Sequence, residues 1–142
     1  MDRRGSAEWR GSLKEGGGTL SSESGTLTNV SYNFGKRFGD EKGTNPEELL
    51  AAAHAACFSM AAAGQLSELG INTEYIRTAV TVRIEKLDAG FTITKVHLQA
   101  RVKAARLDQA SFDTAMNNAK AGCPVSKLFK GAEISMDAQL EG

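Results

Sequence analysis

A run of small side chains in the middle of the chain constrains the fold more than any other feature. Residues 51–64 read AAAHAACFSMAAAG. Asn45 as N-cap, a proline directly after it and Glu48 at N3 predict the start of a helix with a capping box, which ends near Leu69 before Gly70. Because small side chains let another backbone approach closely, we expect this helix to be central and buried on most sides.

Short strands are predicted on both sides of this helix. Residues 7–34 alternate between apolar and polar positions and contain glycine breaks, which is typical of an antiparallel meander. Residues 35–45 are rich in glycine and charge and are expected to form a loop. Residues 76–102 predict a hairpin that turns at Asp88-Ala89-Gly90, with a β-bulge near Thr94-Lys95.

The last third of the chain predicts two helices and a strand. Asp108 caps a helix that ends at Gly122-Cys123, because the residue before Pro124 is pushed away from helical angles. Pro124 starts a further short helix, and residues 132–140 alternate as a closing strand. The order βββ-α-ββ-α-β with antiparallel hairpins predicts an α+β fold, with residues 1–142 as a single domain.

Composition excludes several classes of partner. Seventeen Lys and Arg residues balance seventeen Asp and Glu residues, so no basic face is expected to bind nucleic acid or an anionic membrane. The N-terminal residues contain no apolar segment, so no signal peptide is expected. The apolar stretch 49–64 is short for a membrane span and is interrupted by polar residues. We therefore expect a cytoplasmic protein without a membrane partner.

The two cysteines are the first indication of chemistry. Cys57 and Cys123 are too few for a secreted disulfide framework, and in a reducing compartment a pair that bonds is redox-active. A mid-helix cysteine such as Cys57 is more often a small buried hydrophobe. Cys123 lies between Gly122 and Pro124, where the start of the next helix can lower the pKa of a thiol. Their spacing in the sequence does not show that the two meet.

A metal site is the alternative for the same residues. His54 precedes Cys57 by three positions and faces the same way, and Cys123 would be a third ligand. His97, the other histidine, lies on a predicted strand without a partner motif. We expect His54 to be a packed or hydrogen-bonded core residue and expect no metal or other cofactor. No phosphate-binding loop or Ser-His-Asp order is present.

Two longer motifs stand out in the chain, GTNPEELLAAAHAACFSM at residues 43–60 and AGCPVSKLFKG at residues 121–131. Together they resemble the OsmC/Ohr family of thiol-dependent organic hydroperoxide reductases, and its OsmC branch in particular. The resemblance extends over nearly the whole chain. It implies an OsmC-like α+β fold of antiparallel sheets with two main helices, assembled as an intertwined homodimer around the central helices.

The resemblance also implies a two-cysteine peroxidase. In the family the position of Cys57 is the nucleophile that attacks the peroxide, and the position of Cys123 is the resolving thiol. The positions of Arg37 and Glu47 match the arginine and glutamate that prepare the nucleophile. Without the family, these two are an ordinary loop arginine and an acidic residue in the first turn of a helix. An external dithiol, in the family a lipoylated protein, would reduce the resulting disulfide.

Helix geometry adds a constraint of its own. Glu47 and Cys57 are ten residues apart, so a continuous helix separates them by about 15 Å. Glu47 therefore cannot serve the Cys57 of its own chain, and we expect composite sites in a homodimer. Apolar neighbours such as Phe38, Phe58 and Met60 favour organic hydroperoxides over hydrogen peroxide. A dimeric redox sensor or binding module that toggles the same thiols without turnover is the runner-up.

Overall fold

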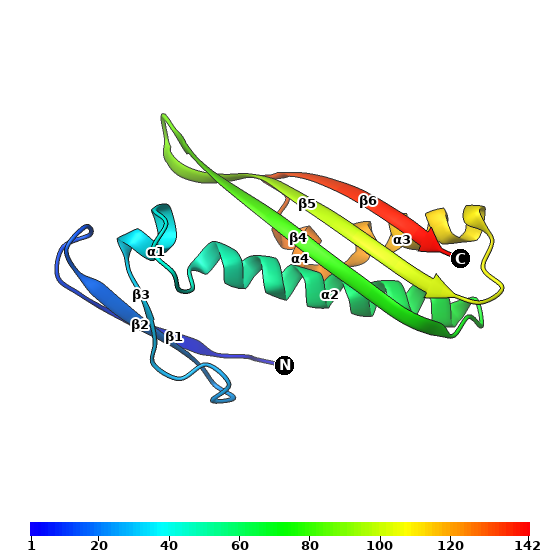
Figure 1. Ribbon diagram of the computed structural model, residues 1–142, viewed down its shortest axis with the longest axis horizontal. Helices are drawn as coiled ribbons and strands as arrows, with labels where there is room; N and C mark the ends of the chain where they lie inside the picture. Colours follow the sequence, from blue (N-terminus) through cyan, green and yellow to red (C-terminus); the bar gives the residue numbers. More distant parts are fainter. The chain divides into compact units, whose positions relative to one another are not determined.

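The computed structural model describes residues 1–142 and divides into two compact units, Met1–Leu49 and Leu50–Gly142. Each unit contains a three-stranded sheet, and the helices form segments separate from the strands along the chain (Figure 1). The predicted α+β class is therefore confirmed.

The sheet of the first unit is the predicted antiparallel meander. Its strands are β1 (Gly5–Arg10), β2 (Gly17–Ser22) and β3 (Val30–Tyr32). Gly18 pairs with Trp9 on one side and Tyr32 on the other. A Cβ at Gly18 would lie 2.8 Å from both aromatic rings and 2.6 Å from the Glu8 carbonyl oxygen, so the sheet requires glycine there.

A short helix replaces part of the loop predicted for residues 35–45. α1 (Phe34–Phe38) begins after Asn33, whose side-chain oxygen accepts a hydrogen bond from the Lys36 N–H at 2.8 Å. This cap offsets the low helix propensity of Gly35, one of the glycines that, with the charged residues, predicted a loop. Arg37 therefore lies on a helix rather than on a loop.

The long helix α2 (Pro46–Glu68) has the predicted bounds to within one residue. The Asn45 side chain accepts from the Glu48 N–H at 2.8 Å, as an N-cap does. The Glu48 carboxylate accepts from the Thr44 hydroxyl at 3.4 Å, whereas the predicted capping box places its bond on the Asn45 N–H.

The expectation that α2 is buried on most sides is wrong for the single chain. One face, with Phe58, Ala62 and Leu66, is fully buried, whereas Met60 is 79% exposed. The reason is that the sheet and α3 cover only one side of the helix. At 23 residues α2 has the length and hydropathy to cross a membrane, contrary to the estimate from its 16-residue apolar stretch. A core helix has the same properties, and its buried face belongs to the core of the second unit.

The second sheet has the order β4-β5-β6, with β5 in the centre. β4 (Thr73–Leu87) and β5 (Gly90–Ala104) form the predicted hairpin, and the register skips Thr94, which confirms the predicted bulge. β6 (Glu133–Glu141) pairs with β5 in parallel, so the expectation of purely antiparallel sheets is wrong here. The helices between β5 and β6 form a crossover, which returns the chain in the same direction.

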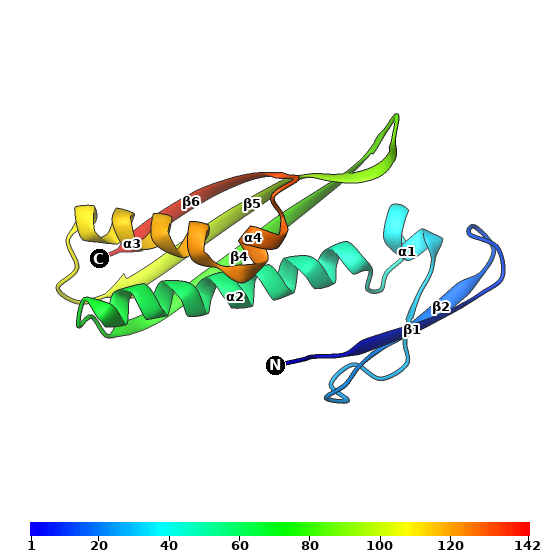
Figure 2. The same ribbon diagram turned by 180° about the vertical axis from the view of Figure 1, so that it is seen from behind.

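α3 (Gln109–Gly122) and α4 (Pro124–Leu128) form that crossover. α3 has the predicted Asp108 cap and bounds, whereas α4 begins at Pro124 as predicted but ends two residues before Lys130. They lie with α2 on one face of the second sheet, as both views show (Figures 1 and 2). The core between these layers consists of Phe58, Ala62, Leu66, Leu98, Ala100, Val102, Phe112, Ala115, Met116 and Ala119.

Candidate active site

The second unit brings the two cysteines together. Cys57 lies on α2 and Cys123 lies between α3 and α4, and their sulfur atoms are 2.8 Å apart. Both are free thiols, so they share a hydrogen bond whose donor is the thiol that keeps its proton. Cys123 has no exposed surface, whereas Cys57 is partly exposed. A small molecule from solution therefore reaches Cys57 first.

The surroundings of the pair favour negative charge on Cys123. Burial and the hydrogen bond with Cys123 raise the pKa of Cys57, against a smaller lowering effect of the Val125 N–H. Burial also raises the pKa of Cys123, but hydrogen bonds from Cys57 and from the N–H and hydroxyl of Ser126 outweigh it, so this pKa is lowered. None of these groups supplies a positive charge to Cys57.

A buried imidazole stands behind the thiol pair. His54 is completely buried, and its Nε2 lies 2.8 Å from the Ser126 hydroxyl oxygen. Its ring packs against Phe129, with the centroids 5.4 Å apart. The expectation of a hydrogen-bonded core histidine is confirmed. No three His, Cys, Asp or Glu side chains converge as a metal site would require, so the metal hypothesis gains no geometric support.

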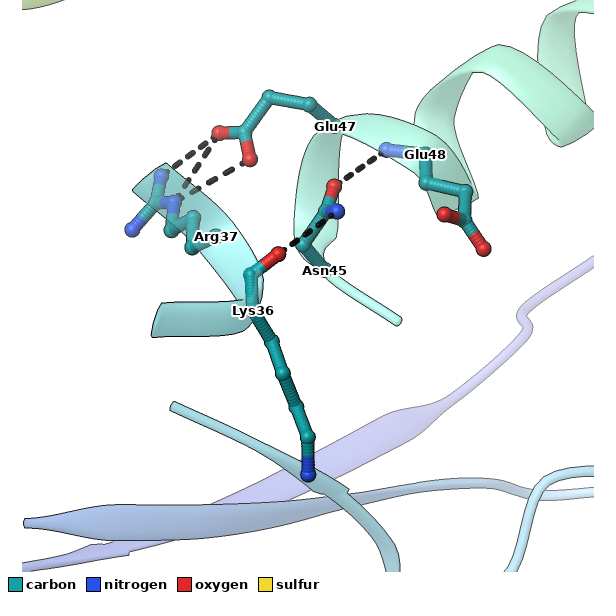
Figure 3. A network of polar contacts seen from close by, with 5 residues as sticks. All are labelled: Lys36, Arg37, Asn45, Glu47 and Glu48. Carbon is teal, nitrogen blue, oxygen red and sulfur yellow. Dashed lines mark hydrogen bonds and ion pairs between the residues drawn. The ribbon is translucent and has the colours of Figure 1, made fainter. Parts of the chain in front are cut away.

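Arg37 and Glu47 form a bidentate ion pair in the first unit (Figure 3). The Arg37 Nη2 donates to Oε1 at 2.7 Å, and Nε lies 3.2 Å from both carboxylate oxygens. The Glu47 side chain is only 10% exposed and that of Arg37 is 35% exposed. Glu47 thus holds one edge of the guanidinium group, while Nη1 keeps its own N–H groups for another acceptor.

Asn45 joins the two helices that carry this ion pair. Its side-chain oxygen caps α2, and its Nδ2 donates to the Lys36 carbonyl oxygen of α1 at 3.2 Å. Figure 3 shows both bonds next to the ion pair. One amide therefore fixes the end of α1 against the start of α2, which sets the separation of Arg37 and Glu47.

An aromatic cavity adjoins Arg37 in the same unit. It has a volume of about 290 Å³ and is lined by Trp9, Leu13, Tyr32, Asn33, Phe34, Arg37 and Phe38. The Arg37 guanidinium lies 5.0 Å from the centroid of the Phe38 ring, and Phe34 packs against that ring. Such a cavity can hold an alkyl or aryl group beside a cation.

Reasoning from the sequence missed several of these residues. It identified Phe38 but not Trp9, Tyr32 or Phe34, whose only signal was aromatic side chains in a short meander. It also missed Ser126, because a serine in a short helix carries no signal of its own. The bond of Asn45 to Lys36 could not be foreseen, since it depends on how α1 ends.

Sequence and structure comparisons with known proteins point to the same protein family. A family model described as OsmC-like protein matches residues 39–138, a range that contains Glu47, Cys57 and Cys123. Peroxiredoxin OsmC of Escherichia coli is 50% identical over 141 residues, which are 99% of this chain and 98% of the relative. Organic hydroperoxide resistance protein OhrB of Bacillus subtilis is 32% identical over 126 residues, 87% of this chain and 88% of the relative. The crystal structure of that OhrB superimposes with a TM-score of 0.66 at 26% identity, covering 96% of this chain and 98% of that one.

The burial of His54 predicts that acid destabilises the fold. Burial lowers the pKa of His54 from its ordinary value of 6.5. The unfolded chain therefore binds a proton first, so the free energy of unfolding falls as the pH drops below about 6.5, by at most about 1.4 kcal/mol per pH unit. Urea denaturation at about pH 7.5 and about pH 5.5 measures this slope.

The control for this prediction uses both histidines. His54→Gln should reduce the loss of stability between the two pH values, whereas His97→Gln should keep it, because His97 lies on the exposed side of β5. An equal loss in the wild type and in His54→Gln would contradict the prediction.

Proposed function

The chain belongs to the OsmC-like protein family, and we propose that it is a thiol-dependent peroxidase that reduces organic hydroperoxides to alcohols and so protects the cell against oxidative stress. The approach of the Cys57 and Cys123 sulfurs to 2.8 Å carries this proposal. The names of the relatives, a peroxiredoxin and an organic hydroperoxide resistance protein, support it.

In the first step the Cys57 thiolate attacks the outer oxygen of the hydroperoxide. The O–O bond breaks, the alkoxide takes a proton and leaves as the alcohol, and Cys57 becomes a sulfenic acid. The partial exposure of Cys57 supports its role as the nucleophile, because Cys123 is sealed from solvent.

In the second step Cys123 attacks the sulfenic sulfur of Cys57. The S–S bond forms, the S–O bond breaks and water leaves, before a second peroxide can oxidise Cys57 to the sulfinic form. The short distance between the sulfurs supports fast resolution. An external dithiol then reduces the disulfide by exchange, and by family resemblance we propose a lipoylated protein.

The first step needs a positive charge that the thiol pair does not have around it. Cys123 and the burial of Cys57 both oppose a Cys57 thiolate. An arginine directed at the sulfur would lower the pKa of Cys57. Glu47 already orients Arg37, and the Arg37 guanidinium keeps further N–H donors for another acceptor. We assign to Arg37 the stabilisation of the thiolate and of the departing oxygen, and to Glu47 the positioning of Arg37.

Arg37 and Glu47 are proposed to serve the thiols of a partner subunit. α2 runs without interruption from Pro46 to Glu68, so the ten residues between Glu47 and Cys57 correspond to about 15 Å of helix. The uncovered face of α2 supports a homodimer, because small and apolar side chains line it in a row suited to a second backbone. These residues are Ala52, Ala53, Ala56, Met60 and Gly64.

The chain is further proposed to act as one domain in the cytoplasm. Helix α2 begins in the first unit and continues into the second, so neither unit contains the whole helix. A reducing compartment supports the cycle, because the disulfide must return to two thiols after every turnover.

The thiol relay has a direct test. One equivalent of an alkyl hydroperoxide should remove both free thiols and about two mass units from the reduced protein. Cys57→Ser and Cys123→Ser should each abolish that loss, and Cys123→Ser should accumulate oxidised Cys57. Thiol titration and intact mass measure these outcomes. Thiols that survive the peroxide in the wild type would contradict the peroxidase and favour a binding module, and oxidation without turnover would favour a sensor.

Mixing two inactive variants tests the composite site. Arg37→Ala should lose most activity for want of a cation, and Cys57→Ser for want of a nucleophile. A mixture, unfolded and refolded together, should regain about a quarter of wild-type turnover, because half of the chains enter heterodimers with one complete site each. If Arg37 served the Cys57 of its own chain, the mixture would remain inactive.

The aromatic cavity beside Arg37 predicts the substrate preference. Each methylene that enters it gains about 0.8 kcal/mol, or about fourfold in kcat/KM, so an alkyl hydroperoxide should exceed hydrogen peroxide. Phe34→Ala should lower kcat/KM for the alkyl hydroperoxide but not for hydrogen peroxide, so the ratio of the two values should fall. Steady-state kinetics with both peroxides measure this ratio, and a wild-type ratio near one would refute the preference.

A further inference from the structure

The side-chain amide of Asn45 binds the backbone beside both members of the Arg37–Glu47 ion pair. Its Nδ2 donates to the Lys36 carbonyl oxygen at 3.2 Å, and its Oδ1 accepts from the Glu48 N–H at 2.8 Å (Figure 3). We propose that Asn45 is a positioning residue, which holds Arg37 against Glu47 and so accelerates the first chemical step. This inference rests on the proposed function and adds a residue that controls that step.

The two peptide groups that Asn45 binds are direct neighbours of the charged residues. The Lys36 carbonyl belongs to the peptide group that leads into Arg37, and the Glu48 N–H belongs to the one that follows Glu47. Each peptide group is planar and rigid, so a hydrogen bond to it also constrains the Cα atom of the charged residue. One short side chain therefore sets the distance between the two backbone segments that carry the ion pair.

Only one orientation of the Asn45 amide satisfies both neighbours. The Glu48 N–H can only donate, so it faces the amide oxygen, and the Lys36 carbonyl can only accept, so it faces the amide nitrogen. The position thus requires an acceptor and a donor on the same side chain. An aspartate there would keep the helix cap, because it is an equally good capping residue, but it would have no donor for the Lys36 carbonyl.

Asn45 differs from the other residues of the connection between α1 and α2. Glu41 bonds α1, and Thr44 bonds α2, whereas Asn45 bonds both helices. Its bonds use backbone atoms, so they occupy neither the guanidinium of Arg37 nor the carboxylate of Glu47. The link between the helices therefore persists when the guanidinium turns toward a sulfur or an oxygen.

A small displacement of the Arg37 backbone becomes a larger displacement at its charged end. The guanidinium lies several rotatable bonds from the Cα atom, and Glu47 binds it at two points only while the two backbone segments keep their distance. Misplacement of a catalytic group by about 1 Å can cost about two orders of magnitude in rate. Loss of the Asn45–Lys36 bond should thus slow the first step without unfolding the chain.

Two substitutions remove this bond and keep the helix cap. Asn45→Asp has no donor for the Lys36 carbonyl, and Asn45→Ser has a side chain one bond shorter, but both residues cap helices well. In a single turnover with an alkyl hydroperoxide, both variants should consume the peroxide about tenfold more slowly than the wild type. The pKa of Cys57, read from the dependence of that rate on pH, should rise in both, as in Arg37→Ala.

A second helix cap in the chain provides a matched control. Asp108 caps α3 as Asn45 caps α2, because its side chain accepts from the Ser111 N–H at 2.8 Å, and it takes no part in the proposed site. Asp108→Asn makes the reverse exchange of capping residues. It should match the wild type in rate and in pH profile, and urea denaturation of every variant measures any loss of stability.

A double-mutant cycle shows whether Asn45 acts through Arg37. In the Arg37→Ala background, Asn45→Ser should change the rate of peroxide loss by less than about twofold, because the guanidinium that it positions is already gone. Slowing by the same factor in both backgrounds would overturn the inference, because Asn45 would then act on the fold or on another group. The comparison holds even where the substitution lowers stability, since both backgrounds contain the same change.

The outcomes also separate this inference from the proposed function. A wild-type rate in Asn45→Ser, together with a slow Arg37→Ala, overturns the positioning role and leaves the peroxidase intact. Slowing in Asn45→Asp alone overturns it as well, because the added charge then accounts for the effect. A wild-type protein whose two thiols survive the peroxide overturns the proposed function and the role of Asn45 with it.

Discussion

The packing of one helical row of α2 against α3 and β5 is the contact on which the thiol pair depends. His54, Phe58, Ala62 and Leu66 are spaced four residues apart, so they form a single ridge, and all four are fully buried. Cys57 precedes Phe58 and lies at the rim of that ridge, which leaves it partly open to solvent. One row of side chains therefore seals the imidazole inside and keeps the sulfur accessible.

The proposed cation site depends on helix ends rather than on a core. Arg37 is in the last turn of α1 and Glu47 in the first turn of α2, so neither is placed by apolar packing alone. Asn45 binds both ends, and the carboxylate grips the guanidinium at two points. Long flexible side chains lose entropy when they are fixed, and in this ion pair that loss has already occurred.

How much could be predicted follows from the range of the interactions involved. The ends of α2 and α3, the bulge at Thr94 and the hairpin were predictable, because caps, glycines and alternation act over a few residues. The parallel pairing of β6 and the exposed face of α2 were not, because they depend on contacts distant in the sequence. Among the candidate residues, the family resemblance named Arg37, Glu47, Cys57 and Cys123. The bond between Ser126 and His54 of α2 joins residues 72 positions apart, so no local pattern encodes it.

The thiols and the cation of the proposed mechanism lie in different units of the chain. The second unit supplies two thiols, a hydroxyl and a neutral imidazole, and its own groups favour negative charge on the sealed Cys123. A Cys57 thiol that keeps its proton would react slowly with a peroxide, because the thiolate is the nucleophile. A guanidinium from a partner subunit would move the charge to the exposed sulfur for the first step. Once that charge has passed to the departing alkoxide, the lowered pKa of Cys123 favours its ionisation for the second step. Because the sulfurs are already 2.8 Å apart, the proton transfer that shifts the charge from one thiol to the other covers a short distance.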